Sequence, residues 1–387
     1  MMASNGMSEE RIITFVYDDL ANDPQNPFPG QLFNHPAPGQ GDDVYANCVQ
    51  PGDYTGQDLT ADNFIAVLTG NASAAPQGKK VLRSTEADNV FVNFIDHGGV
   101  AVIAFPDRLM HNTELVGALR EMKERKMYGR LVFYMEACES GSMFNGVVGG
   151  DLDVYVTTAS SPVQSSWGTF CPPDDVINGT ALNTCLGDLY QVNWMQNVES
   201  AGETETLENQ YLIVKSETNL STVEQYGDLS WTNLPISNFL GDKMKHFPVH
   251  RRREPRKPSV EVASRDVPLH LAYYRYLRSS PLQYGLRQAL AEELLEAVRH
   301  RMEMDSLFMR LAVEVGEQAD FHGVPEGRLV CGECCDEAYR TFQGYCGGFS
   351  DYSLQYTRVI YNLCQRYPPN NISKVIQKLC NNLTQTQ

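Results

Sequence analysis

The chain has 387 residues, which is long for one average domain and suits two. Apolar residues make up 42% of it and charged residues 20%, a mixture that excludes wholesale disorder. The net charge of −17 argues against a nucleic-acid-binding protein, because phosphate recognition needs a basic surface. No apolar run approaches the roughly 20 residues that span a bilayer. We therefore expect a globular protein with neither nucleic acid nor membrane as a partner.

Charge is unevenly distributed along the chain. Up to Asp242 there are 11 basic and 32 acidic residues, a net charge of −21, whereas the remainder carries +4. This asymmetry predicts two units that attract each other. A basic, proline-bounded run at residues 250–258 separates them and is typical of an exposed linker, with a specific ligand site as the alternative.

The first unit alternates strand and helix patterns, which predicts a parallel α/β sheet. Thr60 is a suitable N-cap for the first helix, and Gly70 a suitable stop. The expected strands are residues 11–17, Asn89–Ile95, 130–135 and Val154–Thr158, and the expected helices are residues 60–68 and 112–127.

The second unit has almost no strand signal. Helical spacing of apolar residues covers residues 282–304, 307–317, 352–364 and 372–383. We expect an all-helical domain of roughly 115 residues.

Two expected strand ends carry reactive side chains. Residues 96–99 read Asp-His-Gly-Gly, and residues 136–141 read Glu-Ala-Cys-Glu-Ser-Gly. Ligands of parallel α/β sheets bind at the carboxyl ends of the strands, so His97 could accept the proton of Cys138 and let the thiolate attack a carbonyl. The N–H groups of Gly98 and Cys138 are then candidates for an oxyanion hole. From the pattern alone, an ordinary buried cysteine and a hydrogen-bonded strand-end histidine remain the alternative.

Six segments of the chain, together with the C-terminal cysteine spacing and Arg-Thr-Phe at 340–342, form a distinctive set. They are VYDDL (16–20), DYTGQD (53–58), DHG (96–98), VFYMEACESGS (132–142), SSWG (165–168) and CLGDLY (185–190). In these segments the chain resembles the legumain family, the asparaginyl endopeptidases or vacuolar processing enzymes of the caspase-like clan of cysteine proteases.

The resemblance covers nearly the whole chain and implies its organisation. It implies an α/β fold, a caspase-like, mostly parallel sheet flanked by helices, followed by an all-α prodomain. The implied domains are a catalytic domain at residues 1–242, a linker or activation segment at 243–267 and a helical inhibitory prodomain at 268–387. The activity that it implies is that of a cysteine endopeptidase zymogen.

Carried over residue by residue, the resemblance makes His97 the catalytic base and Cys138 the nucleophile. It also implies that Glu136, Ser166 and Asp188 line the pocket for the P1 residue, which precedes the scissile bond. An asparagine side chain presents an NH2 donor, which carboxylates can accept, and a pocket of this kind can reject analogues strongly. The implied substrates are proteins or peptides with Asn, less readily Asp, at P1. No metal or organic cofactor is implied.

The sequence departs from the family mainly at its start. Legumains carry, before the point matching Asn5, a segment that forms the first central strand and supplies an Arg-His pair of the P1 pocket. We therefore expect an N-terminally truncated catalytic domain that lacks this strand and is not fully active by itself. In addition, Cys48 has no usual counterpart, and Gly99-Val100 replaces the Gly-Pro common in plant members.

Ten cysteines and five Asn-x-Ser/Thr sequons suggest an extracytosolic protein, although the chain starts without a signal peptide. The sequons are at Asn71, Asn178, Asn219, Asn371 and Asn382. Family members work in vacuoles or lysosomes, which the secretory pathway supplies.

The resemblance also implies three disulfides. They are Cys171–Cys185, Cys334–Cys364 and Cys346–Cys380, with Cys331 and Cys335 left unassigned. A zinc site at Cys331, Cys334 and Cys335 is the alternative for that cluster, but no histidine follows at ligand spacing.

Two other functions stay open at this point. One is a peptide asparaginyl ligase, in which an amine resolves the thioester. The other is a non-catalytic binding chain, suggested by the missing N-terminal segment but opposed by the intact His97 and Cys138.

Activation is expected at roughly pH 4–5.5, where carboxylates protonate. No asparagine lies between residues 243 and 361, so self-cleavage would use Asp242 or Asp266; cutting of the 251–253 arginine run by another protease is the alternative.

Overall fold

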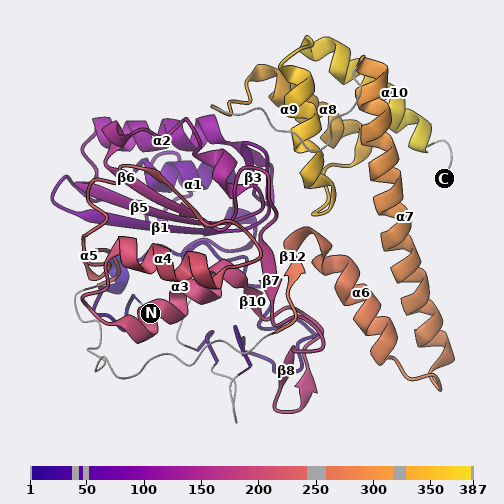
Figure 1. Cartoon of the computed structure of the whole chain (residues 1–387), viewed down its shortest axis with the longest axis horizontal. Helices are drawn as coiled ribbons and strands as arrows, with labels where there is room; N and C mark the ends of the chain where they lie inside the picture. Colours follow the sequence, from indigo (N-terminus) through magenta and orange to yellow (C-terminus); the bar gives the residue numbers. More distant parts are fainter. Residues whose placement is uncertain (1, 37–42, 47–51, 242–258, 317–327, 385–387) are drawn as a thin grey trace.

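The computed structural model of the protein describes residues 2–36, 43–46, 52–241, 259–316 and 328–384. Cys48, Asp242 and the basic run at 250–258 lie outside the described residues. The chain forms an α/β unit followed by a helical C-terminal region (Figure 1).

The centre of the α/β unit is a four-stranded sheet with the order β1-β5-β6-β11. The strands β1, β5 and β6 are parallel, and β11 pairs antiparallel to β6 at one edge. Their bounds are Asn89–Ile95 for β1, Arg130–Glu136 for β5, Val154–Thr158 for β6 and Glu224–Gly227 for β11.

Helices cover both faces of this sheet (Figure 1). Alternate residues of β5 explain why: Leu131 and Phe133 pack into a core shared with α1 and α2, whereas Val132 and Tyr134 pack into a core shared with α3 and α4. A strand buried on both faces reads as a continuous apolar run, as β5 does from Leu131 to Met135. The helices are α1 (Ala61–Leu68), α2 (Asn112–Glu124), α3 (Leu189–Ala201), α4 (Leu207–Glu217) and the short α5 (Ser237–Leu240).

Small antiparallel sheets extend from the carboxyl edge of the central sheet. One has the order β2-β3-β4, another has the order β10-β7-β12, and β8 and β9 form a hairpin. Their bounds are β2 (Gly98–Gly99), β3 (Val102–Ala104), β4 (Leu109–His111), β7 (Trp167–Thr169), β8 (Val176–Ile177), β9 (Thr180–Ala181), β10 (Gly187–Asp188) and β12 (Val262–Ala263). Single 3-10 turns are η1 (Glu9–Arg11), η2 (Gly56–Asp58), η3 (Ser140–Met143), η4 (Gly150–Leu152), η5 (Ser264–Asp266) and η6 (Ser353–Tyr356).

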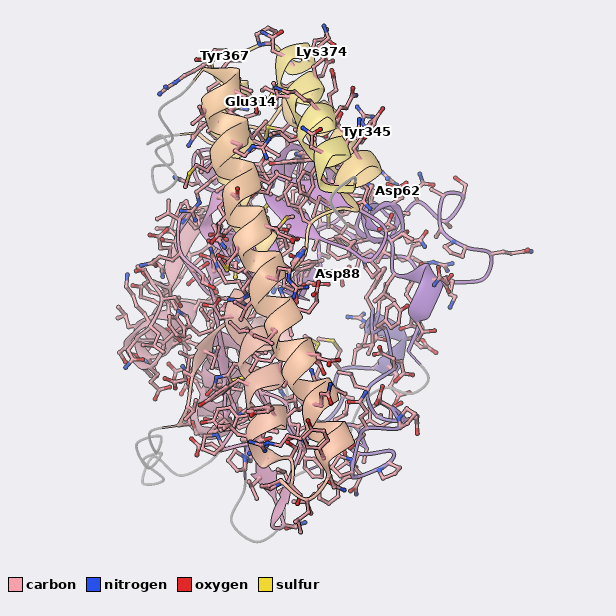
Figure 2. The ribbon with its side chains drawn as sticks, turned by 90° about the vertical axis from the view of Figure 1, so that its right-hand side faces the viewer. Asp62, Asp88, Glu314, Tyr345, Tyr367 and Lys374 are labelled. Atoms are coloured by element: carbon pink, nitrogen blue, oxygen red, sulfur yellow. A yellow bond between two sulfur atoms is a disulfide. The ribbon has the colours of Figure 1, made fainter. Side chains whose placement is uncertain are left out.

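The C-terminal region is helical. Figure 2 shows α7 running along the molecule, with α10 beside its C-terminal part. The helices are α6 (Val267–Arg278), α7 (Tyr284–Val315), α8 (Glu333–Cys346), α9 (Thr357–Cys364) and α10 (Pro369–Thr384). Val100, Ala101 and Val102 of the α/β unit are buried in the same core as Phe308 and Phe342, so one apolar core joins the two parts.

The predicted fold class is confirmed: a mostly parallel sheet flanked by helices precedes a helical region. The prediction of a strand at residues 11–17 is wrong. That segment makes only an isolated parallel bridge, Phe15 with Tyr54, where the two rings stack at 4.2 Å. The helical pattern of residues 282–304, which residues 307–317 continue, corresponds to one long helix, α7. Among the described residues, no helix is long and apolar enough to cross a membrane.

Candidate active site

Neighbouring parallel strands bring the candidate residues together. The last residue of β1, Ile95, pairs with Glu136 at the end of β5, so the segments that follow leave the sheet side by side. Gly98 lies directly against the next turn, since a Cβ at Gly98 would come within 2.5 Å of the Cys138 carbonyl oxygen. His97, Gly98 and Cys138 therefore lie at one edge of the sheet.

The Cys138 thiol is buried. Its Sγ lies 3.1 Å from Ser165 Oγ and 3.5 Å from Ser166 Oγ. Burial, reinforced by the charge of Glu139, raises the pKa of Cys138, against the opposing effects of Arg265 and the two serine hydroxyls. In this arrangement the cysteine is held as a thiol.

The His97 imidazole is directed elsewhere. Its Nε2 lies 3.6 Å from Oδ1 of Asp351, a residue of the helical region. The backbone N–H of His97 donates to Asp96 Oδ1 over 2.7 Å, and burial raises the pKa of Asp96. Among the hydrogen bonds of the described residues, none joins His97 to Cys138.

Two carboxyl groups, the buried Glu136 and the partly buried Asp188, lie close enough to influence each other at this edge of the sheet. Glu136 Oε2 accepts a hydrogen bond of 2.8 Å from the backbone N–H of Gln191, while its Oε1 is buried without a hydrogen-bond partner. Burial, and then the charge of Asp188, raises the pKa of Glu136 well above its usual range. Burial also raises the pKa of Asp188 to about 6. An unpaired oxygen and an elevated pKa are what a pocket that receives a polar group would present.

A segment before α6 crosses the site. Strand β12 pairs antiparallel with β7, with Ala263 opposite Trp167. The next residue, Ser264, donates its N–H to Ser166 O and places its hydroxyl 2.9 Å from the Ser166 hydroxyl. Arg265 then donates to Glu139 over 2.7 Å. The site edge is therefore covered by residues 262–265, which we call the covering segment.

Sequence reasoning did not find the partners from the helical region. Arg358 also donates to Glu139 Oε1 over 2.7 Å, and the Thr357 hydroxyl accepts a 2.9 Å hydrogen bond from the N–H of Val100. The only sequence signal was the charge asymmetry, which predicts attraction between the parts without naming pairs. A second charged contact lies further out, where Arg278 binds Asp175.

Four disulfides are present among the described residues. The structure pairs Cys171 with Cys185, Cys334 with Cys364, and Cys346 with Cys380. It also pairs Cys331 with Cys335, both of which sequence reasoning left unassigned. Because all three cysteines of the alternative zinc cluster are in disulfides, that interpretation is wrong. No group of three or more metal-ligating side chains occurs among the described residues.

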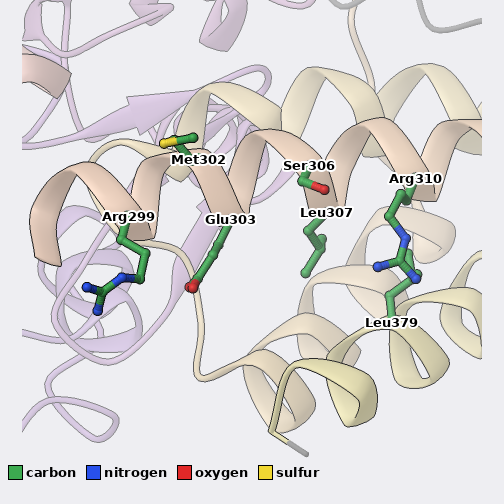
Figure 3. A pocket seen from close by; sticks show the side chains of 7 residues that line it. All are labelled: Arg299, Met302, Glu303, Ser306, Leu307, Arg310 and Leu379. Atoms are coloured by element: carbon green, nitrogen blue, oxygen red, sulfur yellow. The ribbon is translucent and has the colours of Figure 1, made fainter. Parts of the chain in front are cut away.

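A separate cavity of about 300 Å³ lies on the helical region, between α7 and α10 (Figure 3). It contains none of the candidate residues. Its lining consists of Arg299, Met302, Glu303, Ser306, Leu307, Arg310 and Leu379.

The chain is similar to several known proteins over most of its length. Legumain of Rattus norvegicus is 38% identical over 97% of this chain and 85% of its own length. The hemoglobinase of Schistosoma japonicum is 35% identical over 98% and 86%, and the vacuolar-processing enzyme of Vicia sativa is 35% identical over 96% and 78%. Caspase-1 of Spodoptera frugiperda superposes on 50% of this chain and 75% of its own at 12% identity, with a TM-score of 0.33 that is too low to carry an argument.

Family profiles match both parts of the chain. Residues 292–380 match the legumain prodomain. Residues 1–242 match the Peptidase C13 family. The chain therefore belongs to the Peptidase C13 family of cysteine proteases.

Proposed function

We propose that the protein is the zymogen of a cysteine endopeptidase that cleaves after asparagine and, less readily, after aspartate. The observation that carries the proposal is the covering segment, which adds a strand to β7 beside a buried cysteine. Adding an extended peptide to a sheet edge is a common way to bind a substrate. Residues 262–265 then occupy the groove that a substrate would use.

In the proposed reaction, His97 accepts the thiol proton of Cys138, and the thiolate attacks the carbonyl carbon of the P1 residue. Negative charge develops on the carbonyl oxygen, where the N–H groups of Gly98 and Cys138 would stabilise it. The C–N bond breaks, His97 gives the proton to the departing amine, and a thioester remains. Water then hydrolyses the thioester and regenerates the thiol.

Specificity for asparagine follows from the pocket chemistry. Glu136, Ser166 and Asp188 offer acceptors to the side-chain NH2 of an asparagine. The unpaired Oε1 of Glu136 supports this role, since a buried acceptor without a partner costs free energy until a donor arrives. An aspartate lacks that donor unless it is protonated.

Inhibition has two components in this proposal. The covering segment blocks the groove, and its Arg265 donates a hydrogen bond to Glu139, the residue after Cys138. Asp351 of the helical region holds His97, which separates the base from the nucleophile. We accordingly propose a catalytic domain at residues 1–242, an activation segment at 243–267 and an inhibitory prodomain at 268–387. By analogy with its vacuolar-processing relatives, we propose that the protein works in a vacuole or lysosome.

Labelling with an aza-asparagine active-site probe tests the function. Acid-treated full chain is expected to be labelled and to cleave an Asn-containing peptide, and Cys138→Ala is expected to do neither while keeping its thermal transition. His97→Ala should be nearly as severe, because the two residues act as a unit. An unlabelled wild-type chain would favour a binding protein, and a peptide joined to an added amine would favour a ligase.

A further inference from the structure

The turn that follows His97 has an unusual backbone. Gly98 and Gly99 form β2, and Ala101 connects them to β3 with a φ of +60°. A residue with a Cβ pays for this left-handed conformation with roughly 1–3 kcal/mol, and such strain persists only where the surroundings hold it. The contacts around Ala101 must therefore stabilise this backbone conformation.

One buried hydroxyl spans the turn. Ser142 Oγ accepts a 2.8 Å hydrogen bond from the N–H of Ala101 and donates over 3.2 Å to the carbonyl of Gly99. The Ala101 carbonyl in turn accepts from the N–H of Asn112 at 2.9 Å. Ser142 is fully buried and belongs to η3, which begins two residues after Cys138. It therefore ties the His97 turn to the Cys138 loop.

Strand β2, which precedes this turn, carries the candidate oxyanion donor, the N–H of Gly98. Ala104 N–H donates to His97 O over 2.9 Å, so these two residues form a hydrogen-bonded antiparallel pair. The next pair, Gly98 with Ile103, is then of the type that exchanges no hydrogen bonds. The N–H of Gly98 consequently points away from β3. Cys138 adjoins Gly98 closely, as the 2.5 Å clash of a Cβ at Gly98 with its carbonyl shows.

We propose that Ser142 is a positioning residue for the oxyanion hole. It bonds both Gly99 and Ala101, which fixes the turn after Gly98 to the loop that carries Cys138 and so positions the Gly98 N–H. Oxyanion donors act only when they are held where the charge develops, so a small displacement weakens them strongly. The proposal rests on the cysteine-protease function above and deepens it. Ser142 itself touches neither thiol nor substrate.

Two probes separate this role from general packing. A peptide aldehyde ending in aspartal forms a hemithioacetal whose oxygen needs the oxyanion hole, whereas iodoacetamide alkylates the thiolate without forming an oxyanion. In acid-treated full chain, Ser142→Ala is expected to weaken aldehyde inhibition at least about tenfold. The rate of Cys138 alkylation should stay unchanged. Equal aldehyde affinity in wild type and Ser142→Ala, or equal losses with both probes, would overturn the proposal.

Control variants complete the test. Ser140→Ala removes another buried hydroxyl of η3, one that bonds Ser160 and not the turn, and should leave the ratio of the two probes unchanged. Ser142→Thr keeps the hydroxyl and should restore aldehyde affinity. If Ser142→Ala does not fold, Ser142→Cys fills the site with a side chain that forms much weaker hydrogen bonds; it should show the same selective loss when alkylation is followed at Cys138 by peptide mapping. A wild-type chain that reacts with neither probe would contradict the proposed protease function, and this role with it.

Discussion

Arg265 donates from Nη2 to Oε1 of Glu139 over 2.7 Å, one residue along the chain from the candidate nucleophile. The same oxygen accepts a second hydrogen bond of 2.7 Å from Arg358 of α9. Glu139 is completely buried, and both arginines contact its carboxylate. The covering segment and the prodomain helices thus meet at one carboxylate beside Cys138.

Arg358→Gln is expected to loosen the helical region at neutral pH. Hydrogen bonds to a buried charge contribute about 1.5–3 kcal/mol, so the open population should rise roughly 10- to 100-fold. The rate of Cys138 alkylation at pH 7 measures that population. Arg310→Gln, which removes an exposed arginine paired with Glu314 on the same helix, is the matched control and should change nothing. An unchanged rate in Arg358→Gln would show that this contact does not hold the site closed.

Glu136→Gln is expected to reduce cleavage after asparagine and to stabilise the fold at neutral pH. Glutamine keeps the acceptor for Gln191 but presents a donor to the substrate NH2. Burial raises the pKa of Glu136, so the wild-type fold is most stable while this group is protonated and loses stability as pH rises through its elevated pKa. The melting temperatures of variant and wild type should therefore diverge as pH rises. A constant difference between the two melting temperatures from pH 4 to 8 would argue against a raised pKa of Glu136.

The ratio of Asp to Asn cleavage should fall as pH rises through about 6. Burial raises the pKa of Asp188 to about 6, so this carboxyl group of the proposed P1 pocket is protonated in acid and charged above that pH. A charged aspartate at P1 would then meet a charged pocket. Matched peptides that differ only at P1 measure the ratio. A ratio that does not vary between pH 4.5 and 7.5 would remove Asp188 from the pocket.

His111→Gln is expected to make release of the helical region less sensitive to acid. The His111 ring stacks on Tyr339, and its Nε2 lies 2.5 Å from Asp336 of α8. Burial lowers the pKa of His111, against the charges of Asp336 and Glu114 and together with those of Arg108 and Arg340.

Because docking lowers the pKa of His111, the docked state is most stable at pH values above the pKa of an exposed histidine. The free energy of docking becomes less favourable as the pH falls through the lowered pKa. Size-exclusion chromatography after nicking, run between pH 7 and 4.5, measures release. His300→Gln, at a histidine that bonds Ser350 inside the helical region, is the control. The same release curve in His111→Gln and wild type would count against this switch.

Arg301→Gln is expected to speed self-cleavage after Asp266. Asp266 Oδ1 accepts a 2.6 Å hydrogen bond from Arg301 Nη1, and losing this bond would free the carboxylate to enter the proposed P1 pocket. Sequencing of the new C-terminus after incubation at low pH identifies the cut. Arg299→Gln, on an exposed arginine of the same helix, should behave as wild type. New ends within the 251–253 arginine run, or ends that persist in Cys138→Ala, would indicate another protease.

Local patterns determined much of the α/β unit and the candidate site. Asn89–Ile95 and Val154–Thr158 are strands with the predicted bounds, and Thr60 caps α1 by accepting a hydrogen bond from the N–H of Asn63. These features depend on residues within a few positions of one another. The position of the two reactive side chains followed too, because parallel strands end at one edge of the sheet and bring His97 and Cys138 there.

The tertiary structure alone decided which residues hold the site. Glu139 meets Arg358 across 219 positions, and Val100 meets Thr357 across 257. Periodicity and propensity report on neighbours in the chain, so they carry no information about such pairs. The same limit explains the wrong strand prediction for residues 11–17. Their β-rich composition carries no information on whether a partner strand lies alongside them. Composition thus predicted attraction between the two parts, whereas packing decided that they meet at one buried carboxylate.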